Sequence, residues 1–167
     1  MIMEDTRNSL IRTMKEYFGE DDRRISHALE VLSLAERIQK VEGGKLKIVE
    51  AAAILHNIKI PESERKYNSS AGRYQEIEGP PVAERILRNF GFSEEEIDHI
   101  CRIIANHHSD KGIDSVEFRI VWDADWLVNI PDEFDLADRE KIKKIVDEVF
   151  KTAEGAVLAG KFIEMEV

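Results

Sequence analysis

The sequence predicts an all-α fold, a compact multi-helix bundle that forms one domain over residues 1–167. Apolar residues recur at helical spacing along almost the whole chain, and no segment of useful length alternates as a strand does. Only 9 glycines and 4 prolines interrupt this pattern. The chain also shows no internal repeat, low-complexity tract or domain boundary.

The helix boundaries follow from capping residues, glycines and prolines. The expected helices run over about 6–18, from the Asp21-Asp22 cap to Gly43-Gly44, over about 46–58, from Pro80-Pro81 to Gly91, from Ser93 to about His108, from Ser115 to about Pro131, and as one or two more after about Leu136. The third is apolar over much of its circumference, as expected for a central buried helix. Proline in its first turn marks the start of the fourth, and Ser93 with Glu96 forms a capping box for the fifth.

Residues 61–78, PESERKYNSSAGRYQEIE, form the main irregular segment. A loop of this length is uncommon in a compact domain, and such loops are often functional. This segment is therefore expected to contribute residues to a binding or catalytic site.

The charge balance disfavours two classes of partner. Lys and Arg number 24 against 34 Asp and Glu, which gives a formal net charge of −10. An acidic surface repels nucleic acid and anionic membranes, so neither is an expected partner. A local basic pocket for a phosphate remains compatible with this balance.

The composition favours a cytoplasmic protein. The single cysteine, Cys101, cannot form an internal disulfide and lies in an apolar run, where it is expected as a small buried hydrophobic residue. The N-terminal segment lacks the positive flank and apolar stretch of a signal peptide, and no run reaches transmembrane length.

Four of the five histidines fall at helix ends or on apolar helix faces. His27 precedes apolar residues at helical spacing, His56 follows two alanines on the central helix, and His107 and His108 close the fifth helix. Asp125 has apolar residues one turn before and one turn after it, and a carboxylate there is costly to bury unless it is paired or bound to metal. Imidazole and carboxylate together suit a borderline divalent ion such as Mn, Fe, Co, Ni or Zn.

Each of these residues also has a purely structural interpretation. Taken singly, an inward histidine is more often a hydrogen-bonded core residue than a ligand. His99 follows a run of acidic residues and is expected at the surface. Asp123 either supports a metal ligand or is a solvated acid, and we favour the first.

The order of these groups resembles the HD superfamily. The segments that carry the resemblance are HALEVLSLAERI, AAAILHNI, RIIANHH and IVWDADWL, which lie between Arg24 and Asn129. The family pattern is a histidine on one helix, a His-Asp pair on the next core helix, often further histidines, and a distant aspartate. The resemblance implies a helical bundle of the HD-domain type with a motif-bearing core over about residues 21–130.

The resemblance also implies a site for a divalent ion (Mn, Fe, Co, Ni, Zn or Mg). The ligands that it assigns are His27, His56, Asn57 and Asp125. Asp125 matches the final aspartate of the family better than Asp123 does. His107 and His108 match histidines that some members use for a second metal or for substrate phosphate.

Asn57 departs from the family pattern, which has an aspartate at this position. An amide offers a carbonyl oxygen but no charge, so it holds a divalent ion less well and is a poor bridge between two ions. This departure bears on catalysis more than on the fold.

Family members are mostly phosphohydrolases of nucleotides or other phosphate esters, so the resemblance implies a metal-dependent phosphohydrolase with a small phosphorylated substrate. Cationic side chains would neutralise the phosphate. The residues to which we assign catalytic roles are Arg24, Lys59, Glu76 and Glu78. Those assigned to substrate binding are Lys66, Arg73 and Tyr74, with Arg65 a further cation. Glu78 also suits a cap of the fourth helix, and Tyr67 and Trp126 either stack on a base or pack.

Two other interpretations stay open. Asn57 favours an inert HD module that binds a nucleotide or metal as a sensor or partner domain. The histidines also fit a helical domain in which they are only structural. We rank the phosphohydrolase first, the inert module second and the structural domain third.

Overall fold

The computed structural model describes residues 2–58, 72–107, 109 and 112–164. The helices in these ranges are α1 (Ile2–Phe18), α2 (Asp22–Glu42), α3 (Leu46–Leu55), α5 (Gly72–Arg88), α6 (Glu94–Asn106), α7 (Val116–Glu133), α8 (Arg139–Val149) and α9 (Ala153–Glu164). No strand occurs among the described residues, and the predicted all-α class is confirmed.

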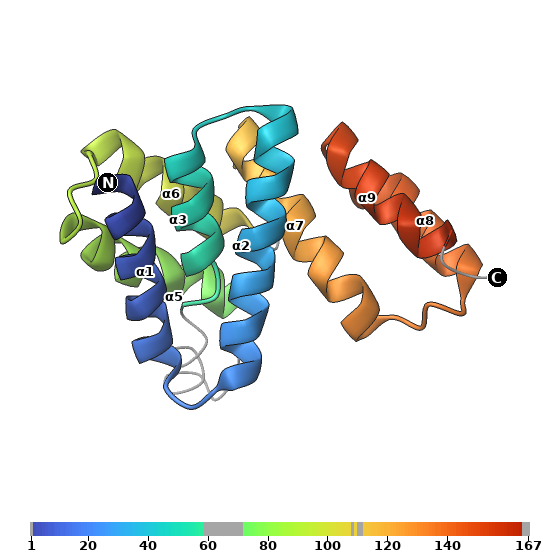
Figure 1. The fold of residues 1–167 in the computed structure, drawn as a ribbon, viewed down its shortest axis with the longest axis horizontal. Coiled ribbons are helices and arrows are strands. Elements are labelled where there is room, and N and C mark those ends of the chain that lie inside the picture. The colour runs from blue at the N-terminus through green and yellow to red at the C-terminus, as the bar shows by residue number, and fades with distance from the viewer. Residues whose placement is uncertain (1, 59–71, 108, 110–111, 165–167) are drawn as a thin grey trace.

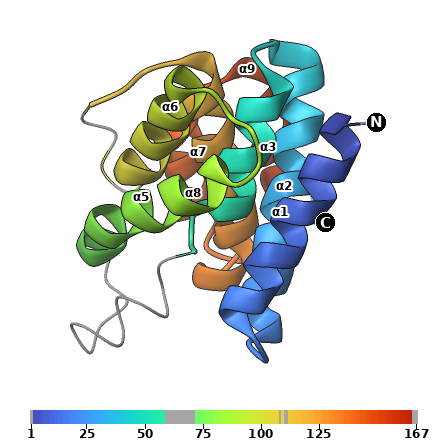
Figure 2. The same ribbon diagram turned by 90° about the vertical axis from the view of Figure 1, so that its left-hand side faces the viewer.

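Helix α3 forms the centre of the bundle. Seven of its ten residues are buried, and it packs against α1, α2, α6 and α7. Figure 1 shows α3 between α1 and α2, and Figure 2 shows α5 and α6 on another side of the bundle. The short side chains of Ala51, Ala52 and Ala53 let neighbouring helices approach closely. The C-terminal end of α3 therefore lies where several helices meet.

The capping residues expected from the sequence begin three helices. The carboxylate of Asp21 accepts a hydrogen bond from a backbone N–H in the first turn of α2. Ser93 and Glu96 form a capping box, with hydrogen bonds of 3.1 and 2.8 Å, at the start of α6. The hydroxyl of Ser115 accepts a hydrogen bond from the backbone N–H of Phe118 in the first turn of α7. These three boundaries confirm the predicted ones because the side-chain chemistry at each is local.

Helix α5 begins at Gly72, so the prediction that it starts at Pro80-Pro81 is wrong. Both prolines lie inside the helix, and part of the predicted loop, residues 72–78, is helical. Proline has a helical φ and removes one backbone hydrogen bond, so a helix that packs on a neighbour can continue through it. Here that neighbour is α6. Glu78 therefore lies within the helix and does not cap its start.

The helices α8 and α9 form a pair on the side of the bundle away from α1 (Figure 1). Helix α9 contacts α7 and α2. The further helices expected after Leu136 are thus two. Over the described ranges, none of the helices has the length and apolar character needed to cross a bilayer.

Candidate metal centre

Three side chains from different helices meet at one point in the bundle. His27 lies in α2, His56 directly follows α3, and Asp125 lies in α7. One ligand atom from each lies within 4.8 Å of the other two. Nε2 of His27 is 3.1 Å from Oδ1 of Asp125, and Nε2 of His56 is 3.3 Å from the same oxygen. The expected convergence of these three residues is confirmed.

The separations suit donor atoms around a single ion. Two atoms that each bind an ion at about 2.0–2.1 Å, at octahedral or tetrahedral angles, lie roughly 2.9–3.4 Å apart. Two imidazole nitrogens and a carboxylate oxygen are also donors that Zn²⁺ and related borderline ions prefer. The residues present therefore fit a divalent ion.

The hydrogen bonding of His56 fixes which of its nitrogens faces Asp125. His56 caps the C-terminus of α3, and its Nδ1 lies 2.7 Å from the carbonyl oxygen of Ala53, so Nδ1–H donates to that carbonyl. In a neutral ring Nε2 then carries a lone pair. This nitrogen is buried and makes no hydrogen bond among the described residues. A lone pair and a carboxylate oxygen at 3.3 Å repel each other unless a cation lies between them.

Asp125 carries the negative charge of the centre. Burial alone would raise the pKa of this carboxyl. In the metal-free protein, hydrogen bonding by the rings of His27 and His56, with the positive charge that His56 and His107 carry when protonated, outweighs burial and holds the pKa of Asp125 well below its ordinary value. Asp125 is therefore ionised and suited to a cation.

His107 repeats the local design of His56. It caps the C-terminus of α6, and its Nδ1 lies 2.6 Å from the carbonyl oxygen of Ile104. Its ring meets the ring of His56 edge-on, with centroids 5.5 Å apart. His107 thus extends the cluster beside His56. The two carbonyl acceptors were not predicted from the sequence, although both histidines directly follow the last residue of a core helix, where a backbone carbonyl is free to accept.

Two other predicted site residues lie close to these in the chain. Arg24 is one turn before His27 on α2, and its Nη1 lies 3.2 Å from Oδ2 of Asp21. Asn57 lies in the turn after α3 and is partly exposed. Their roles stay predictions.

The remaining predicted site residues fall into two groups. Those outside the described residues are Lys59, Arg65, Lys66, Tyr67 and His108. Helix α5 includes the backbone of four more, whose side chains are not described: Arg73, Tyr74, Glu76 and Glu78.

Two expectations beside the centre are corrected. Asp123 is neither solvated nor in contact with a ligand. It is fully buried, and its carboxylate accepts hydrogen bonds from residues 151 and 152. His99 is half-buried rather than fully exposed: its Nε2 lies 2.8 Å from Oγ of Ser115, and 27% of its side chain stays exposed.

Trp126 and Cys101 show packing contacts. The ring of Trp126 stacks on that of Phe134, with centroids 6.3 Å apart, which supports the packing interpretation. Cys101 is half-buried rather than buried, and its thiol donates to the carbonyl oxygen of Pro80. Burial raises the pKa of this thiol to about 11, so it stays protonated at neutral pH.

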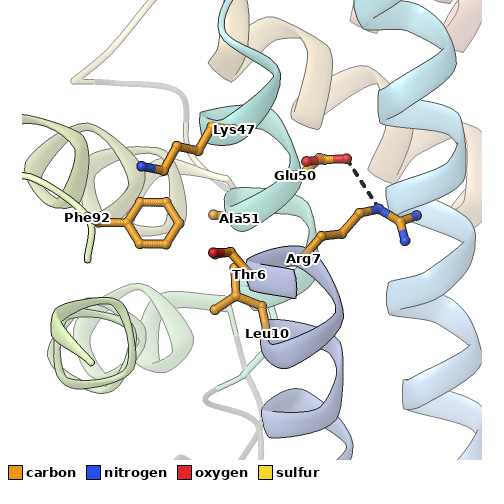
Figure 3. Close-up of a pocket in the computed structure, with 7 residues that line it drawn as sticks. All are labelled: Thr6, Arg7, Leu10, Lys47, Glu50, Ala51 and Phe92. Carbon is orange, nitrogen blue, oxygen red and sulfur yellow. Dashed lines mark ion pairs between the residues drawn. The ribbon is translucent and has the colours of Figure 1, made fainter. Parts of the chain in front are cut away.

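A separate hollow lies at the N-terminal end of α3, between α1 and Phe92 (Figure 3). Its wall includes Arg7, which pairs with Glu50, and Lys47, whose ammonium lies over the Phe92 ring. The space in it that a water-sized molecule can occupy is about 10 Å³. Small-molecule sites span about 300–1,000 Å³, so this hollow is far too small for a nucleotide.

Comparison with known proteins gives the same family as the resemblance noted in the sequence. The family model described as HD domain matches residues 24–130, which include His27, His56 and Asp125. None of the curated proteins compared matches this chain.

Several solved structures share the fold. A predicted HD superfamily hydrolase from an uncultured Thermotogales bacterium is 24% identical with a TM-score of 0.73, over 95% of this chain and 85% of that one. An HD-superfamily hydrolase from Bacillus thuringiensis is 22% identical with a TM-score of 0.70, over 98% and 93%. Bacillus subtilis YpgQ, in complex with ADP, is 22% identical with a TM-score of 0.71, over 98% and 90%.

Proposed function

Since the chain belongs to the HD domain family, we propose that it is a metal-dependent phosphohydrolase that acts on a nucleotide or another small phosphate ester. The proposal rests on the family and on the donor set of three residues from α2, α3 and α7. Its reaction class is the hydrolysis of a phosphate ester, with water as the nucleophile.

One observation carries the metal part of the proposal. The buried Nε2 of His56 faces an ionised carboxylate, while its Nδ1–H is held by a backbone carbonyl. Histidines that bind metal commonly donate their other N–H to a carbonyl, which fixes the tautomer. A divalent ion satisfies both His56 and Asp125 at once.

The residues of this chain supply ligands and charge. His27, His56 and Asp125 would hold the ion and leave positions open for water and substrate. When bound, a divalent ion polarises a phosphoryl oxygen and lowers the pKa of a bound water. Arg24 is fixed one turn before His27 and can offer a guanidinium to a phosphate oxygen, since this group matches phosphate geometry.

The substrate class follows from the same chemistry and from one relative. YpgQ has this fold and was crystallised with ADP. We infer a nucleoside phosphate as the first substrate to test. Lys66, Arg73 and Tyr74 remain the proposed substrate-binding residues, and Lys59, Glu76 and Glu78 remain proposed catalytic residues.

Asn57 favours a second candidate, an HD module without catalysis that binds metal or a nucleotide as a sensor or partner domain. The amide lacks the charge of the family's aspartate at this position. With Asp125 as the one anionic donor in the described set, the site neutralises only part of a divalent charge. A site that binds the ion more weakly also positions and activates the metal-bound water less effectively.

The experiment is metal analysis of the purified chain by plasma emission, with a hydrolysis screen of nucleoside mono-, di- and triphosphates in Mn²⁺ or Zn²⁺. His56→Ala is expected to lose the ion and the hydrolysis while keeping its helical circular dichroism. The matched control is His99→Gln, which changes a partly buried histidine that bonds Ser115 instead.

The outcomes separate the candidates. Metal with hydrolysis supports the phosphohydrolase, and metal without hydrolysis supports the inert module. Equal metal content in His56→Ala and the parent chain contradicts both.

A further inference from the structure

Helix α7 carries two buried aspartates on opposite sides. Asp125 faces His27 and His56, whereas Asp123 is two residues earlier. Residues two apart lie about 200° apart around a helix axis. Asp123 therefore faces away from the metal centre, toward the C-terminal helix pair, and belongs to no part of the chemistry proposed above.

Asp123 binds the junction between α8 and α9 with both carboxylate oxygens. Oδ1 accepts a hydrogen bond of 2.9 Å from the backbone N–H of Lys151. Oδ2 accepts from the backbone N–H of Thr152 at 2.8 Å and from its hydroxyl at 2.6 Å. The Thr152 hydroxyl oxygen in turn accepts from the N–H of Gly155 in the first turn of α9. One fully buried side chain thus accepts three hydrogen bonds from residues 151 and 152, directly before the start of α9.

The contact is close as well as polar. A Cβ atom at Gly155 would lie 2.2 Å from Oδ2 of Asp123, so α9 approaches α7 to a distance that only glycine permits. The neighbouring Trp122 donates its indole N–H to the carbonyl oxygen of Val149 and carries the Lys151 ammonium over its ring. Two adjacent residues of α7 therefore hold the whole junction.

We propose that Asp123 is a positioning residue for the metal centre: by binding the α8–α9 junction it fixes the rotation of α7, and with it the place of the Asp125 carboxylate. This inference rests on the proposed metal site. It assigns a role in that site to α8 and α9, which lie beyond residues 24–130 of the family match.

Metal sites tolerate only small changes in ligand distance, so a small rotation of α7 about its axis would weaken metal binding by Asp125. A carboxylate oxygen lies about 5 Å from its helix axis, so a rotation of about 10° moves it by about 0.9 Å. Ligand distances in metal sites hold to within about 0.2 Å. A helix is stiff between positions two residues apart, so an anchor at Asp123 acts directly on the rotation that places Asp125.

The test uses the full chain and four variants. Asp123→Asn keeps the shape of the side chain but turns one acceptor into a donor, which faces the N–H groups of the junction. Thr152→Val removes the hydroxyl that bonds Asp123, and Thr152→Ser keeps it. Ile142→Ala is the control, because it opens a cavity in α8 while leaving the Asp123 contacts in place.

Two readouts are taken at a temperature where circular dichroism shows every variant folded. Titration calorimetry gives the Mn²⁺ dissociation constant, and long-range ¹H–¹⁵N spectra of the metal-free protein give the imidazole signals of His27 and His56. We expect Asp123→Asn and Thr152→Val to weaken Mn²⁺ binding at least about fivefold and to shift both sets of ring signals. Thr152→Ser and Ile142→Ala should leave both readouts unchanged.

The two proposals fail in different ways. If the parent chain binds no Mn²⁺, the proposed function fails, and the positioning role is decided by the imidazole signals alone. If Asp123→Asn and Thr152→Val match the parent in both readouts, Asp123 is a structural anchor and the inference is overturned. The same holds if Ile142→Ala changes the readouts as much as they do. Should Asp123→Asn not fold, Thr152→Val against Thr152→Ser decides.

Discussion

At the scale of single residues, the proposed metal site has three converging donors but only one negative charge, that of Asp125, to set against the two charges of a divalent ion. Asp125 is ionised and sits between two imidazoles. Asn57, next to His56, is where the family pattern supplies a second carboxylate. The imidazole donors carry no charge when they bind an ion, so we expect the charge at position 57, a proposed ligand, to affect how strongly the site holds it.

Asn57→Asp is expected to tighten Mn²⁺ binding by at least about tenfold, equivalent to about 1.4 kcal/mol. The amide and carboxylate are nearly isosteric, so the change adds one charge with little change in packing. Titration calorimetry of both proteins measures the difference. Asn89→Asp, which adds the same charge at an exposed position, is the control.

If Asn57 is instead a structural residue, a carboxylate there is unpaired. Asn57→Asp would then lower the melting temperature in chelator and leave the affinity for Mn²⁺ unchanged or weaker. That result would remove Asn57 from the ligand set.

Gly155→Ala is expected to destabilise the fold by about 2–3 kcal/mol, because its Cβ would overlap the Asp123 carboxylate and the Thr152 hydroxyl. Urea unfolding measures the change. Gly160→Ala in the same helix is the control, since among the described residues no heavy atom beyond its chain neighbours and the local helix backbone lies within 4 Å of its Cβ. That control should be neutral or stabilising by up to about 1 kcal/mol. Equal losses in the two variants would contradict the close approach of α9 to α7.

The sequence predicted the convergence of His27, His56 and Asp125 but not the direction of Asp123. The three converging residues each lie on an apolar helix face, and their order resembles a known family. Asp123 also lies among apolar residues, because α7 is buried on two sides. Periodicity shows that a helix face is buried but not which element covers it. Asp123 was therefore expected to support a metal ligand, whereas it contacts the α8–α9 junction.

At the scale of elements, prediction succeeded where a side chain caps its own helix. Ser93, Ser115 and Asp21 act within one turn, so their positions suffice. The start of α5 was missed because proline was treated as a boundary. Whether a helix continues through proline depends on its packing, here on α6, which is a tertiary contact.

A shared ion cluster joins α1 to α2 and α3. Nε of Arg7 lies 2.8 Å from Glu36 and 3.2 Å from Glu50 (Figure 3 shows the second pair). Burial, together with the hydrogen bond and charge of Glu36, raises the pKa of Glu50 to about 7, and Arg7 acts in the opposite direction. Burial also opposes the ionisation of Glu36, but the hydrogen bond from Arg7 keeps its pKa below the ordinary value.

This arrangement predicts a pH dependence with a definite sign. The pKa of Glu50 is raised from 4.5 to about 7, so folding takes up a proton between these values and Glu50 costs stability as the pH rises through them. Glu50→Gln removes that cost. Its melting temperature relative to the parent chain should therefore be higher at pH 8 than at pH 5. The exposed Glu95→Gln is the control, and a Glu50→Gln difference independent of pH would contradict the assignment.

At the scale of the whole molecule, the bundle brings together residues far apart in the chain. His27 and Asp125 are separated by 98 positions, yet their side chains are in hydrogen-bond contact. The central α3 makes this possible because its small, buried residues let α2 and α7 pack close to it. The C-terminal pair α8–α9 contacts α7 on the side opposite to the metal centre, through Asp123. The site is thus a property of the assembled bundle rather than of one motif.

The central claim is that His27, His56 and Asp125 bind one divalent ion. Its most direct test is a crystal of this chain soaked in Zn²⁺, with diffraction recorded at the zinc absorption edge. We expect one anomalous peak about 2.0–2.2 Å from Nε2 of His27, Nε2 of His56 and a carboxylate oxygen of Asp125. A crystal without a peak among these three residues, or with zinc bound only at surface carboxylates, would contradict the claim.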